Sequence, residues 1–403
     1  MKVLVAGGGT GGHVYPALAL VEELRRRFKN ISIGYVGTAR GLEARVVKSE
    51  PDVQFFEIDA SGLNLGFSMR SVTRVLSNIK GLGQSLKVIA QFDPQIIIGT
   101  GGYVSFGPLL WGTLLKIPTL IHEQNRVPGL ANQLLASRVD AVLTSFPETA
   151  SEIRARRAVC TGLPLRRSIL SIRENVDSQQ AKESLNLDPK KRVVLVMGGT
   201  HGAQFIHEQL VSHAERMRQE KIELVILAGN DAERLQREAY LRGFSQLKIL
   251  SHTPDVGRWM RAADVMICRA GGSTLAEMTA LGVPSIVIPW PGAAHHHQEQ
   301  NGAWLAERGA CLLLQESDCH GSHLIDNIVG LLNDEISLRR LNKSCQAVGK
   351  PDATQLVLRE VIGHLEHGKR TETLSLYRYW RRWNERLGVD LARAGAFRQR
   401  FGL

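Results

Sequence analysis

Both halves of this sequence begin with the same succession of residue types, and this repetition limits the fold more than any other feature. A mainly apolar run at residues 2–6 leads into the glycine-rich residues 7–12, and a run at 192–197 leads into the glycine-rich residues 198–202. A helical pattern follows in each case. Strand, glycine turn and helix is how a doubly wound parallel sheet starts. The sequence therefore predicts two Rossmann-like domains.

The rest of the chain alternates short apolar runs with helical stretches, as parallel α/β folds do. Further strands are expected at residues 31–36, 95–99, 119–122, 141–144, 223–228, 248–250, 265–268 and 285–288. The stretch 154–192 is polar, charged and uneven, which places the domain boundary near residues 162–167. We expect an N-terminal domain at 1–165 and a C-terminal domain at 166–348, which face each other across a deep, ligand-binding cleft.

Composition restricts the partners of the chain. Its 403 residues suffice for two domains, and no apolar run of about 18 residues occurs that would span a membrane. The formal net charge of +11 favours anionic lipid or phosphorylated substrates. No helix-turn-helix, zinc-finger or RNA-recognition pattern occurs, so nucleic acid is not an expected partner. The five scattered cysteines indicate free thiols rather than disulfides or a zinc site.

The first glycine loop suits a phosphate group. Gly7, Gly9 and Gly12 match the pattern G-x-G-x-x-G, but NAD binding also needs an acidic residue at the end of the next strand. The strand 31–36 is followed by glycine and threonine instead, which disfavours NAD. Free N–H groups at a helix N-terminus still make a good phosphate cradle. The structural alternative is a tight turn that needs a positive φ.

His13 follows this loop directly, at the entrance of the next helix. An imidazole accepts a proton near neutral pH, as a general base must. The alternative role is that of a capping or packing histidine.

Polar clusters follow two later strands at their carboxyl ends, where open α/β sheets place their sites. Residues 122–125 read His-Glu-Gln-Asn, and residues 268–277 contain a glycine turn, Ser273, Thr274 and Glu277. The second cluster can hold a diphosphate on amides and hydroxyls, with Glu277 accepting hydrogen bonds from ribose hydroxyls. The alternatives are a polar loop for residues 122–125, and for Glu277 a helix N-terminal acid that the dipole favours.

A third polar cluster, residues 295–301, contains three successive histidines. Adjacent residues on a helix point about 100° apart, so they chelate a metal poorly. The amide groups of this cluster suit sugar hydroxyls better. No Asp-x-Asp pattern occurs to hold a metal-bridged diphosphate, so no metal is expected.

Four segments carry a family resemblance: Gly-Gly-Thr-Gly-Gly-His at 8–13, Gly-Tyr-Val-Ser at 102–105, His-Glu-Gln-Asn at 122–125, and Cys-Arg-Ala-Gly at 268–271 with Glu277. Together they resemble the MurG family of peptidoglycan glycosyltransferases, over roughly residues 1–365. The resemblance implies a GT-B fold and a helix at 349–367 that crosses back to the first domain. It also implies an inverting transfer of N-acetylglucosamine (GlcNAc) from UDP-GlcNAc, without cofactor or protein-bound metal. The acceptor is lipid I, undecaprenyl-diphosphate-linked N-acetylmuramic acid (MurNAc) pentapeptide, whose C4 hydroxyl is glycosylated to give lipid II.

Carried over position by position, the resemblance implies a role for each matching residue. His13 is the catalytic base. The acceptor diphosphate is bound by Gly8, Gly9, Thr10, Gly102 and Tyr103. The donor is bound by Thr10, Gly11, Gly12, Asn125, Arg166, Thr200, Ser273, Thr274, Glu277 and Gln298. Within this set Asn125 and Gln298 contact the sugar, Arg166 and Thr200 the phosphates, and Glu277 the ribose.

The chain departs from the family's pattern at two of the donor-binding segments. Leu163 stands where the family has Asn, and Gln204 stands where it has Arg, while Thr200 keeps the hydroxyl of the family's Ser. These departures concern the details of donor binding and leave the class unchanged.

A lipid-linked acceptor requires docking on a membrane without crossing it. Within residues 67–90, apolar side chains recur every three or four positions among basic ones, as an interfacial helix requires: Met69, Val72, Leu76, Ile79 and Leu82 among Arg70, Arg74, Lys80 and Lys87. Trp111 is a further candidate, and an ordinary amphipathic core helix is the alternative. The resemblance implies that this patch faces an anionic membrane surface, on the cytoplasmic face of the inner membrane. It also implies contacts with proteins of cell-wall synthesis or division.

The tail at 368–403 is expected to be a second interfacial anchor. From residue 366 onward it has nine basic and four acidic side chains, with Tyr377, Tyr379, Trp380 and Trp383 interleaved, a composition that suits the surface of an anionic bilayer. The alternatives are a partner- or RNA-binding arm and a disordered extension.

Three other functions are alternatives for a chain with these residues. Another GT-B enzyme that moves a UDP-sugar to a lipid acceptor would share both glycine loops, and residues 122–125 argue against it. A UDP-sugar epimerase of this architecture would need carboxylates near the sugar in place of the glycine loop with His13. A non-catalytic binding protein would tolerate the loss of His13 or Glu277, and both are present.

Overall fold

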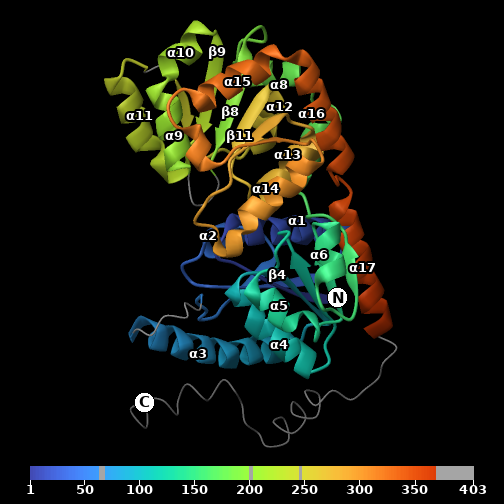
Figure 1. Cartoon of the computed structure of the whole chain (residues 1–403). Helices are drawn as coiled ribbons and strands as arrows, with labels where there is room; N and C mark the ends of the chain where they lie inside the picture. Colours follow the sequence, from blue (N-terminus) through green and yellow to red (C-terminus); the bar gives the residue numbers. More distant parts are fainter. Residues whose placement is uncertain (63–68, 199–202, 245–246, 369–403) are drawn as a thin grey trace, which may run out of the picture.

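The computed structural model describes residues 1–62, 69–198, 203–244 and 247–368, which form two α/β domains (Figure 1). The tail from residue 369 onward and Thr200 lie outside the described residues, as do the side chains of Met69, Arg70 and Val72.

The N-terminal domain contains a seven-stranded sheet in the order β3-β2-β1-β4-β5-β6-β7, and neighbouring strands pair in parallel. Its strands are β1 (Lys2–Gly7), β2 (Ser32–Gly37), β3 (Val53–Glu57), β4 (Ile96–Gly101), β5 (Thr119–Glu123), β6 (Ala141–Thr144) and β7 (Ala158–Cys160). Strands β4 and β5 are buried along their whole length, because helices cover both faces of the sheet.

The C-terminal domain contains a six-stranded parallel sheet in the order β10-β9-β8-β11-β12-β13. Its strands are β8 (Arg192–Met197), β9 (Ile222–Leu227), β10 (Lys248–Leu250), β11 (Val265–Cys268), β12 (Ser285–Val287) and β13 (Leu312–Leu313). The strand order reverses at β1 and β4 in the first sheet and at β8 and β11 in the second. Open α/β sheets bind ligands at the carboxyl ends of such strands. The prediction of two doubly wound domains is confirmed.

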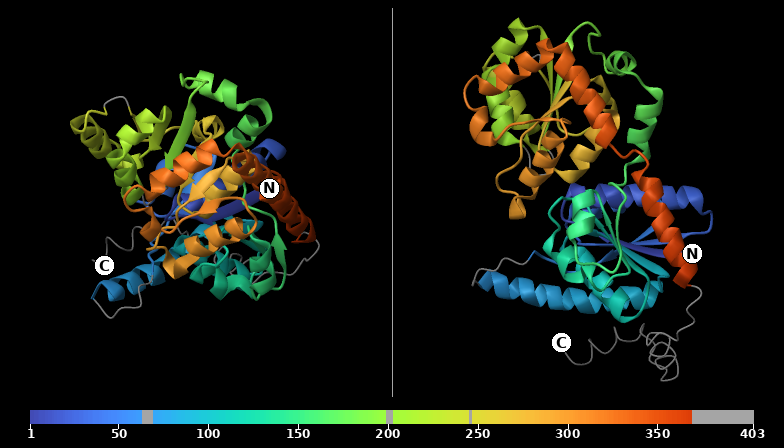
Figure 2. Two further views of the ribbon diagram at one scale, coloured as in Figure 1. Left: turned by 45° about the horizontal axis from the view of Figure 1, so that its top comes forward. Right: turned by 45° about the vertical axis from the view of Figure 1, so that its right-hand side comes forward.

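Helices pack on both faces of each sheet (Figures 1 and 2). Those of the N-terminal domain are α1 (Gly11–Arg27), α2 (Leu42–Val47), α3 (Met69–Phe92), α4 (Phe106–Leu114), α5 (Leu130–Ala136) and α6 (Pro147–Glu152). The second half contains α7 (Arg167–Asn175), α8 (Ser178–Ser184), α9 (Gln204–Ser212), α10 (Ala214–Gln219), α11 (Ala232–Leu241), α12 (Val256–Ala262), α13 (Gly272–Leu281), α14 (His297–Glu307), α15 (His323–Asn333), α16 (Glu335–Val348) and α17 (Ala353–Gly368). Among the described helices, none combines the length and apolar composition that crossing a bilayer requires.

The last helix, α17, packs against the N-terminal domain although it follows the C-terminal one (Figure 2, right). Its buried residues Val357, Leu358 and Val361 belong to the apolar cluster formed by β1 and α1. The two segments that connect the domains are also bonded to each other. The backbone N–H of Leu165 donates to the Thr354 hydroxyl (2.9 Å), which in turn donates to the carbonyl of Leu165 (3.1 Å).

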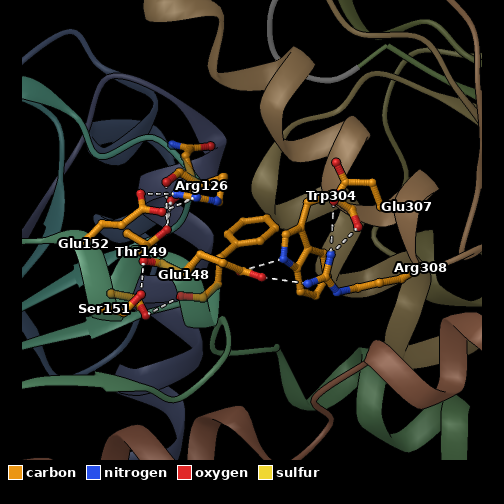
Figure 3. A network of polar contacts seen from close by, with 11 residues as sticks. Arg126, Glu148, Thr149, Ser151, Glu152, Trp304, Glu307 and Arg308 are labelled. Atoms are coloured by element: carbon orange, nitrogen blue, oxygen red, sulfur yellow. Dashed lines mark hydrogen bonds and ion pairs between the residues drawn. The ribbon is translucent and has the colours of Figure 1, made fainter.

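A polar network joins the domains between α6 and α14 (Figure 3). The Glu148 carboxylate accepts hydrogen bonds from the Trp304 indole N–H (2.7 Å) and the Arg308 guanidinium (2.6 Å). The guanidinium also lies over the Trp304 ring, 3.9 Å from its centroid, and the Phe146 ring meets the same indole edge-on at 5.1 Å. We call this set, Phe146, Glu148, Trp304 and Arg308, the interdomain latch.

Replacing Leu358 by alanine tests whether α17 is part of the N-terminal core. A buried leucine truncated to alanine leaves a cavity, so we expect the free energy of unfolding to fall by about 2–5 kcal/mol. Urea denaturation followed by circular dichroism measures it. Arg359→Ala, at an exposed position of the same helix, serves as the control and should change stability by less than about 0.5 kcal/mol. An unchanged transition in Leu358→Ala would show that α17 contributes nothing to that core.

Candidate active site

The loops at the carboxyl ends of the two sheets meet where the strand orders reverse. The Ser273 hydroxyl at the start of α13 donates to the carbonyl of Gly12 at the start of α1 (3.4 Å). Gly272 packs against the backbone of Gln124, whose carbonyl oxygen would lie 2.6 Å from a Cβ at that glycine. The glycine loop, the segment 122–125 and the α13 turn, all predicted from the sequence, are thus neighbours in space.

The glycine loop is shaped by a carboxylate that the sequence analysis did not single out. Glu43, on α2, is completely buried. It accepts hydrogen bonds from the N–H of Gly9 (3.1 Å) and from the N–H and hydroxyl of Thr38 (2.9 and 2.7 Å). Gly9 itself has φ +88°, so the turn that the structural alternative required is present. The loop is therefore held from behind by Glu43.

The residues expected to bind the acceptor diphosphate lie in and around the glycine loop. Gly102 (φ +76°) touches Gly8 so closely that a Cβ there would lie 2.4 Å from the Gly8 carbonyl oxygen. The half-exposed Tyr103 hydroxyl lies 3.6 Å from the position that a Cβ on Gly9 would take. The N-terminus of α1, with no acidic residue in its first turn, opens onto the same place. Gly8, Gly9, Gly102 and Tyr103 are thus brought together.

His13 is held in one tautomer. Its Nδ1 lies 2.9 Å from the carbonyl of Gly8, to which only a protonated Nδ1 can donate, so the lone pair of the neutral ring is on Nε2. Burial lowers the pKa of His13 below its ordinary value, and the nearby His297 adds to this, while the Gly8 hydrogen bond and Glu123 oppose it. A neutral imidazole with a free Nε2 is the form that accepts a proton.

Three of the four polar residues at 122–125 are buried and shape the loop, so the polar-loop alternative does not describe them. His122 Nε2 lies 2.8 Å from the carbonyl of Gly162, and burial lowers the pKa of His122 to about 4. Glu123 accepts hydrogen bonds from the N–H of Asn125 (2.9 Å), the N–H of Gly129 (2.9 Å) and the side chain of Asn132 (2.7 Å). Only Asn125 is partly exposed, where it can reach a ligand.

The two residues expected at the ribose and phosphates of the donor contact each other. The Arg166 guanidinium pairs with the Glu277 carboxylate at 3.0 Å and stacks over the Tyr15 ring, 4.7 Å from its centroid. Burial raises the pKa of Glu277, and the adjacent Arg166 opposes this. Because the pair joins α7 to α13 beside α1, it lies where both domains meet.

The remaining predicted donor residues surround α13 and α14. Ser273 and Thr274 form the first turn of α13, and Gln298 in the first turn of α14 accepts a hydrogen bond from the N–H of Trp290 (3.0 Å). The departure at Leu163 has a structural reason, since this side chain is buried in a small apolar cluster with Leu165. Within the part of the chain that the structure describes, no group of three or more His, Cys, Asp or Glu side chains is arranged to hold a metal ion.

The sequence analysis missed Glu43, which lies within the N-terminal domain, and Asn301 and the interdomain latch, which join the two domains. The bonds of Glu43 to Gly9, of Asn301 to Asn125 and of Trp304 to Glu148 connect residues that are far apart in sequence, so no local pattern marks them. Asn301 belongs to the polar segment 295–301 that was singled out, without a role of its own.

Two doubly wound domains joined by a double crossing, with α17 returning to the first, define the GT-B architecture. Matches to family models identify the chain as a glycosyltransferase of this class. The N-terminal domain of glycosyltransferase family 28 matches residues 3–144, and its C-terminal domain matches residues 193–357. The chain is 37% identical, over 89% of its length and 97% of the relative's, to the UDP-N-acetylglucosamine–N-acetylmuramyl-(pentapeptide) pyrophosphoryl-undecaprenol N-acetylglucosamine transferase of Desulforudis audaxviator. It is 35% identical to the protein of the same name from Listeria monocytogenes, over 90% of this chain and 99% of that one.

Solved structures agree with this. The crystal structure of Acinetobacter baumannii MurG is similar with a TM-score of 0.70 and 27% identity, covering 90% of this chain and 99% of that one. A UDP-N-acetylglucosamine 2-epimerase from Listeria monocytogenes, at 15% identity and a TM-score of 0.63 over 91% of this chain and 97% of that one, shares the fold alone. The chain belongs to the MurG family of N-acetylglucosamine transferases within glycosyltransferase family 28, as its sequence motifs predicted.

Replacing Glu43 by glutamine tests whether this carboxylate holds the glycine loop. Glutamine has one acceptor oxygen where the carboxylate has two, and its NH₂ group would face an N–H donor. We expect the free energy of unfolding to fall by about 1–3 kcal/mol, and backbone amides of residues 7–14 to exchange hydrogen faster. Denaturation and hydrogen–deuterium exchange measure both effects. The control is Glu57→Gln, at an exposed glutamate whose partner is Lys48. Unchanged exchange in the loop would refute the role of Glu43.

Proposed function

We propose that this chain transfers GlcNAc from UDP-GlcNAc to the C4 hydroxyl of MurNAc in undecaprenyl-diphosphate-linked MurNAc-pentapeptide, which converts lipid I to lipid II. The main observation behind the proposal is the state and position of His13 in a family 28 chain. Its ring is neutral with Nε2 free, and it lies between the glycine loop and the turn that precedes α13. The choice of UDP-GlcNAc as donor and of a lipid-linked acceptor follows from the names of the relatives.

The N-terminal domain binds the acceptor in this proposal. The acceptor diphosphate lies against the glycine loop formed by Gly8, Gly9 and Thr10 and against the N-terminus of α1, with Gly102 and Tyr103 beside it. The N–H of Gly9 is not one of its donors, because it is bonded to Glu43. Helix N-termini favour anions through their free N–H groups and their dipole. The MurNAc C4 hydroxyl then reaches His13.

The reaction needs one proton acceptor and a stabilised leaving group. His13 Nε2 takes the proton of the C4 hydroxyl while its oxygen attacks C1 of GlcNAc from the face opposite the phosphate. The bond from C1 to the phosphate oxygen breaks, and the anomeric configuration inverts. UDP leaves with its new negative charge on the N-terminus of α13, where Ser273 and Thr274 donate, and near Arg166.

The donor is bound mainly by the C-terminal domain. Glu277, kept in place by Arg166, accepts the ribose hydroxyls, and Gln298 and Asn125 contact the GlcNAc hydroxyls. The segment Thr10, Gly11 and Gly12 approaches the donor from the other domain, as the contact between Ser273 and Gly12 suggests. Thr200 is assigned to the phosphates by the family resemblance alone.

The exposed face of α3 is proposed to dock on an anionic membrane, so that the protein is peripheral on the cytoplasmic face of the inner membrane. Val75, Leu76 and Ile79 expose 46%, 60% and 60% of their surfaces, and Leu114 of the neighbouring α4 exposes 55%. Such a concentration of large apolar side chains on one surface is uncommon unless it meets a partner. Lys80 and Lys87 are exposed on the same helix and favour anionic lipid.

Trp111 is only partly exposed, and its indole donates to the carbonyl of Leu82. Contacts with cell-wall synthesis and division proteins rest on the family resemblance alone.

Transfer of radiolabelled GlcNAc from UDP-GlcNAc to a lipid I analogue tests the proposed reaction, with UDP-glucose and UDP-galactose as competitors. We expect a lipid II analogue as product, and we expect UDP-glucose and UDP-galactose to compete weakly.

His13→Ala should lower kcat by about 10²–10⁴ and leave the KM for UDP-GlcNAc unchanged, because the base acts only in the chemical step. Since the base must be neutral and burial lowers the pKa of His13, the fall of kcat with decreasing pH should have its midpoint below the ordinary histidine value of about 6.5. Absence of product, or a His13→Ala variant with near-normal kcat, would contradict the proposal.

Charging the α3 face tests membrane docking. Each large apolar side chain transferred out of water contributes about 1.5–3 kcal/mol when fully buried. We therefore expect Leu76→Glu with Ile79→Glu to weaken binding to phosphatidylglycerol-containing vesicles by about tenfold or more, measured by vesicle sedimentation. Leu241→Glu, at a leucine that exposes 78% of its surface on α11, is the matched control. Equal binding by the α3 variant and this control would rule out the docking face.

A further inference from the structure

Helix α14 turns one face toward the N-terminal domain. Asn301, Trp304 and Arg308 follow one another at spacings of three and four residues, so they lie on the same side of the helix and its end. Trp304 and Arg308 belong to the interdomain latch, whose contacts with Glu148 are visible in Figure 3. Asn301 lies one turn nearer the substrate site.

Asn301 is completely buried and bonded to both domains. Its Nδ2 donates to the side-chain oxygen of Asn125 (3.0 Å) and to the carbonyl of Ala270 (3.0 Å), and its Oδ1 accepts from the N–H of Arg126 (2.8 Å). Ala270 belongs to the turn before α13, in the same domain as Asn301, whereas the other two partners belong to the N-terminal domain. The side-chain amide of Asn301 thus connects the turn that precedes α13 to the loop that contains Asn125.

These bonds leave Asn125 little freedom. Its Oδ1 is taken by Asn301, and its backbone N–H is taken by Glu123. An asparagine amide whose oxygen is fixed has its NH₂ group fixed as well, because the two groups share one plane. Only the NH₂ group, which has a long contact of 3.4 Å with Glu123, has an N–H left to offer a ligand. Asn301 therefore decides which end of the Asn125 amide faces the substrate site.

The interdomain latch keeps Asn301 beside Asn125. Arg308 and Trp304 bind both oxygens of Glu148, and both the guanidinium and the Phe146 ring pack on the indole. Because the latch fixes α14 against α6, Asn301 can meet Asn125 only when the domains stand as they do in this structure.

We propose that Asn301 is a positioning residue, which presents the NH₂ group of Asn125 to the donor sugar and makes this presentation depend on domain closure. The proposal rests on the proposed function, in which Asn125 contacts a hydroxyl of GlcNAc. It predicts that Asn301 acts on the sugar part of the donor through Asn125, while the uridine diphosphate part is bound independently of it.

Titration calorimetry of the full chain, once with UDP-GlcNAc and once with UDP, distinguishes binding of the sugar from binding of the uridine diphosphate. Asn301→Ala should weaken UDP-GlcNAc binding about tenfold, as loss of a buried hydrogen bond does, and should leave UDP binding unchanged. Asn125→Ala should give a similar loss, and the double variant should lose no more than Asn125→Ala alone. Retained UDP binding reports that the C-terminal domain is folded, and Asn301→Ser provides a milder second variant. Arg359→Ala, an exposed change on α17 outside the latch and the site, should alter neither affinity.

Equal losses of UDP and UDP-GlcNAc affinity, or additive losses in the double variant, would overturn the positioning role, since Asn301 would then act only on structure or on the donor directly. A wild-type chain that fails to bind UDP-GlcNAc would instead contradict the proposed function. The two failures are therefore distinguishable in one set of titrations.

Discussion

Two buried carboxylates fix the loops on which the candidate active site depends. Glu43 lies behind the glycine loop and Glu123 lies behind the segment that carries Asn125, and each accepts hydrogen bonds from the backbone of the loop that it supports. A carboxylate buried without such donors would be costly, so loop and carboxylate stabilise each other. The positions of His13 and Asn125 follow, since each is attached to one of these loops.

The electrostatic design of the site relies on backbone more than on charged side chains. The N-termini of α1 and α13 meet, with Ser273 bonded to the carbonyl of Gly12, and neither helix has an acidic residue in its first turn. A lipid-linked diphosphate and a nucleoside diphosphate can each be bound by one of these termini. Arg166 is already engaged with Glu277, which orders its guanidinium before a donor arrives. Such preorganised dipoles stabilise charge without having to reorient during the reaction.

The fold was predictable because its strongest signals are local. The ten strands expected from apolar runs are present, whereas β3, β7 and β13 were missed. Strand β3 is an edge strand that alternates in exposure, and β7 and β13 are very short edge strands, so none has a long apolar run. His13 was found because it comes directly after a glycine loop, and residues 122–125 were found because they stand at the carboxyl end of a strand. The bonds of Glu43 to Gly9 and of Asn301 to Asn125 depend on how distant segments meet, and no spacing in the sequence encodes them.

The interface between the domains is suited to opening and closing. Apart from the packing of α17, it includes directed polar contacts such as those of Glu148 and Asn301 and the aromatic pair of Phe146 and Trp304. Interfaces with such polar contacts separate more easily than large apolar ones. The two chain crossings are tied together at Leu165 and Thr354. The contacts of α14 with α6 and with the segment 122–125 are made between the domains, so they depend on how the domains stand relative to each other. Opening would therefore break the bond between Asn301 and Asn125 together with the latch, while Glu43 and Glu123, each bonded within its own domain, would keep their loops in shape. Each half of the site would stay preformed, and only the contacts that join the halves would depend on closure.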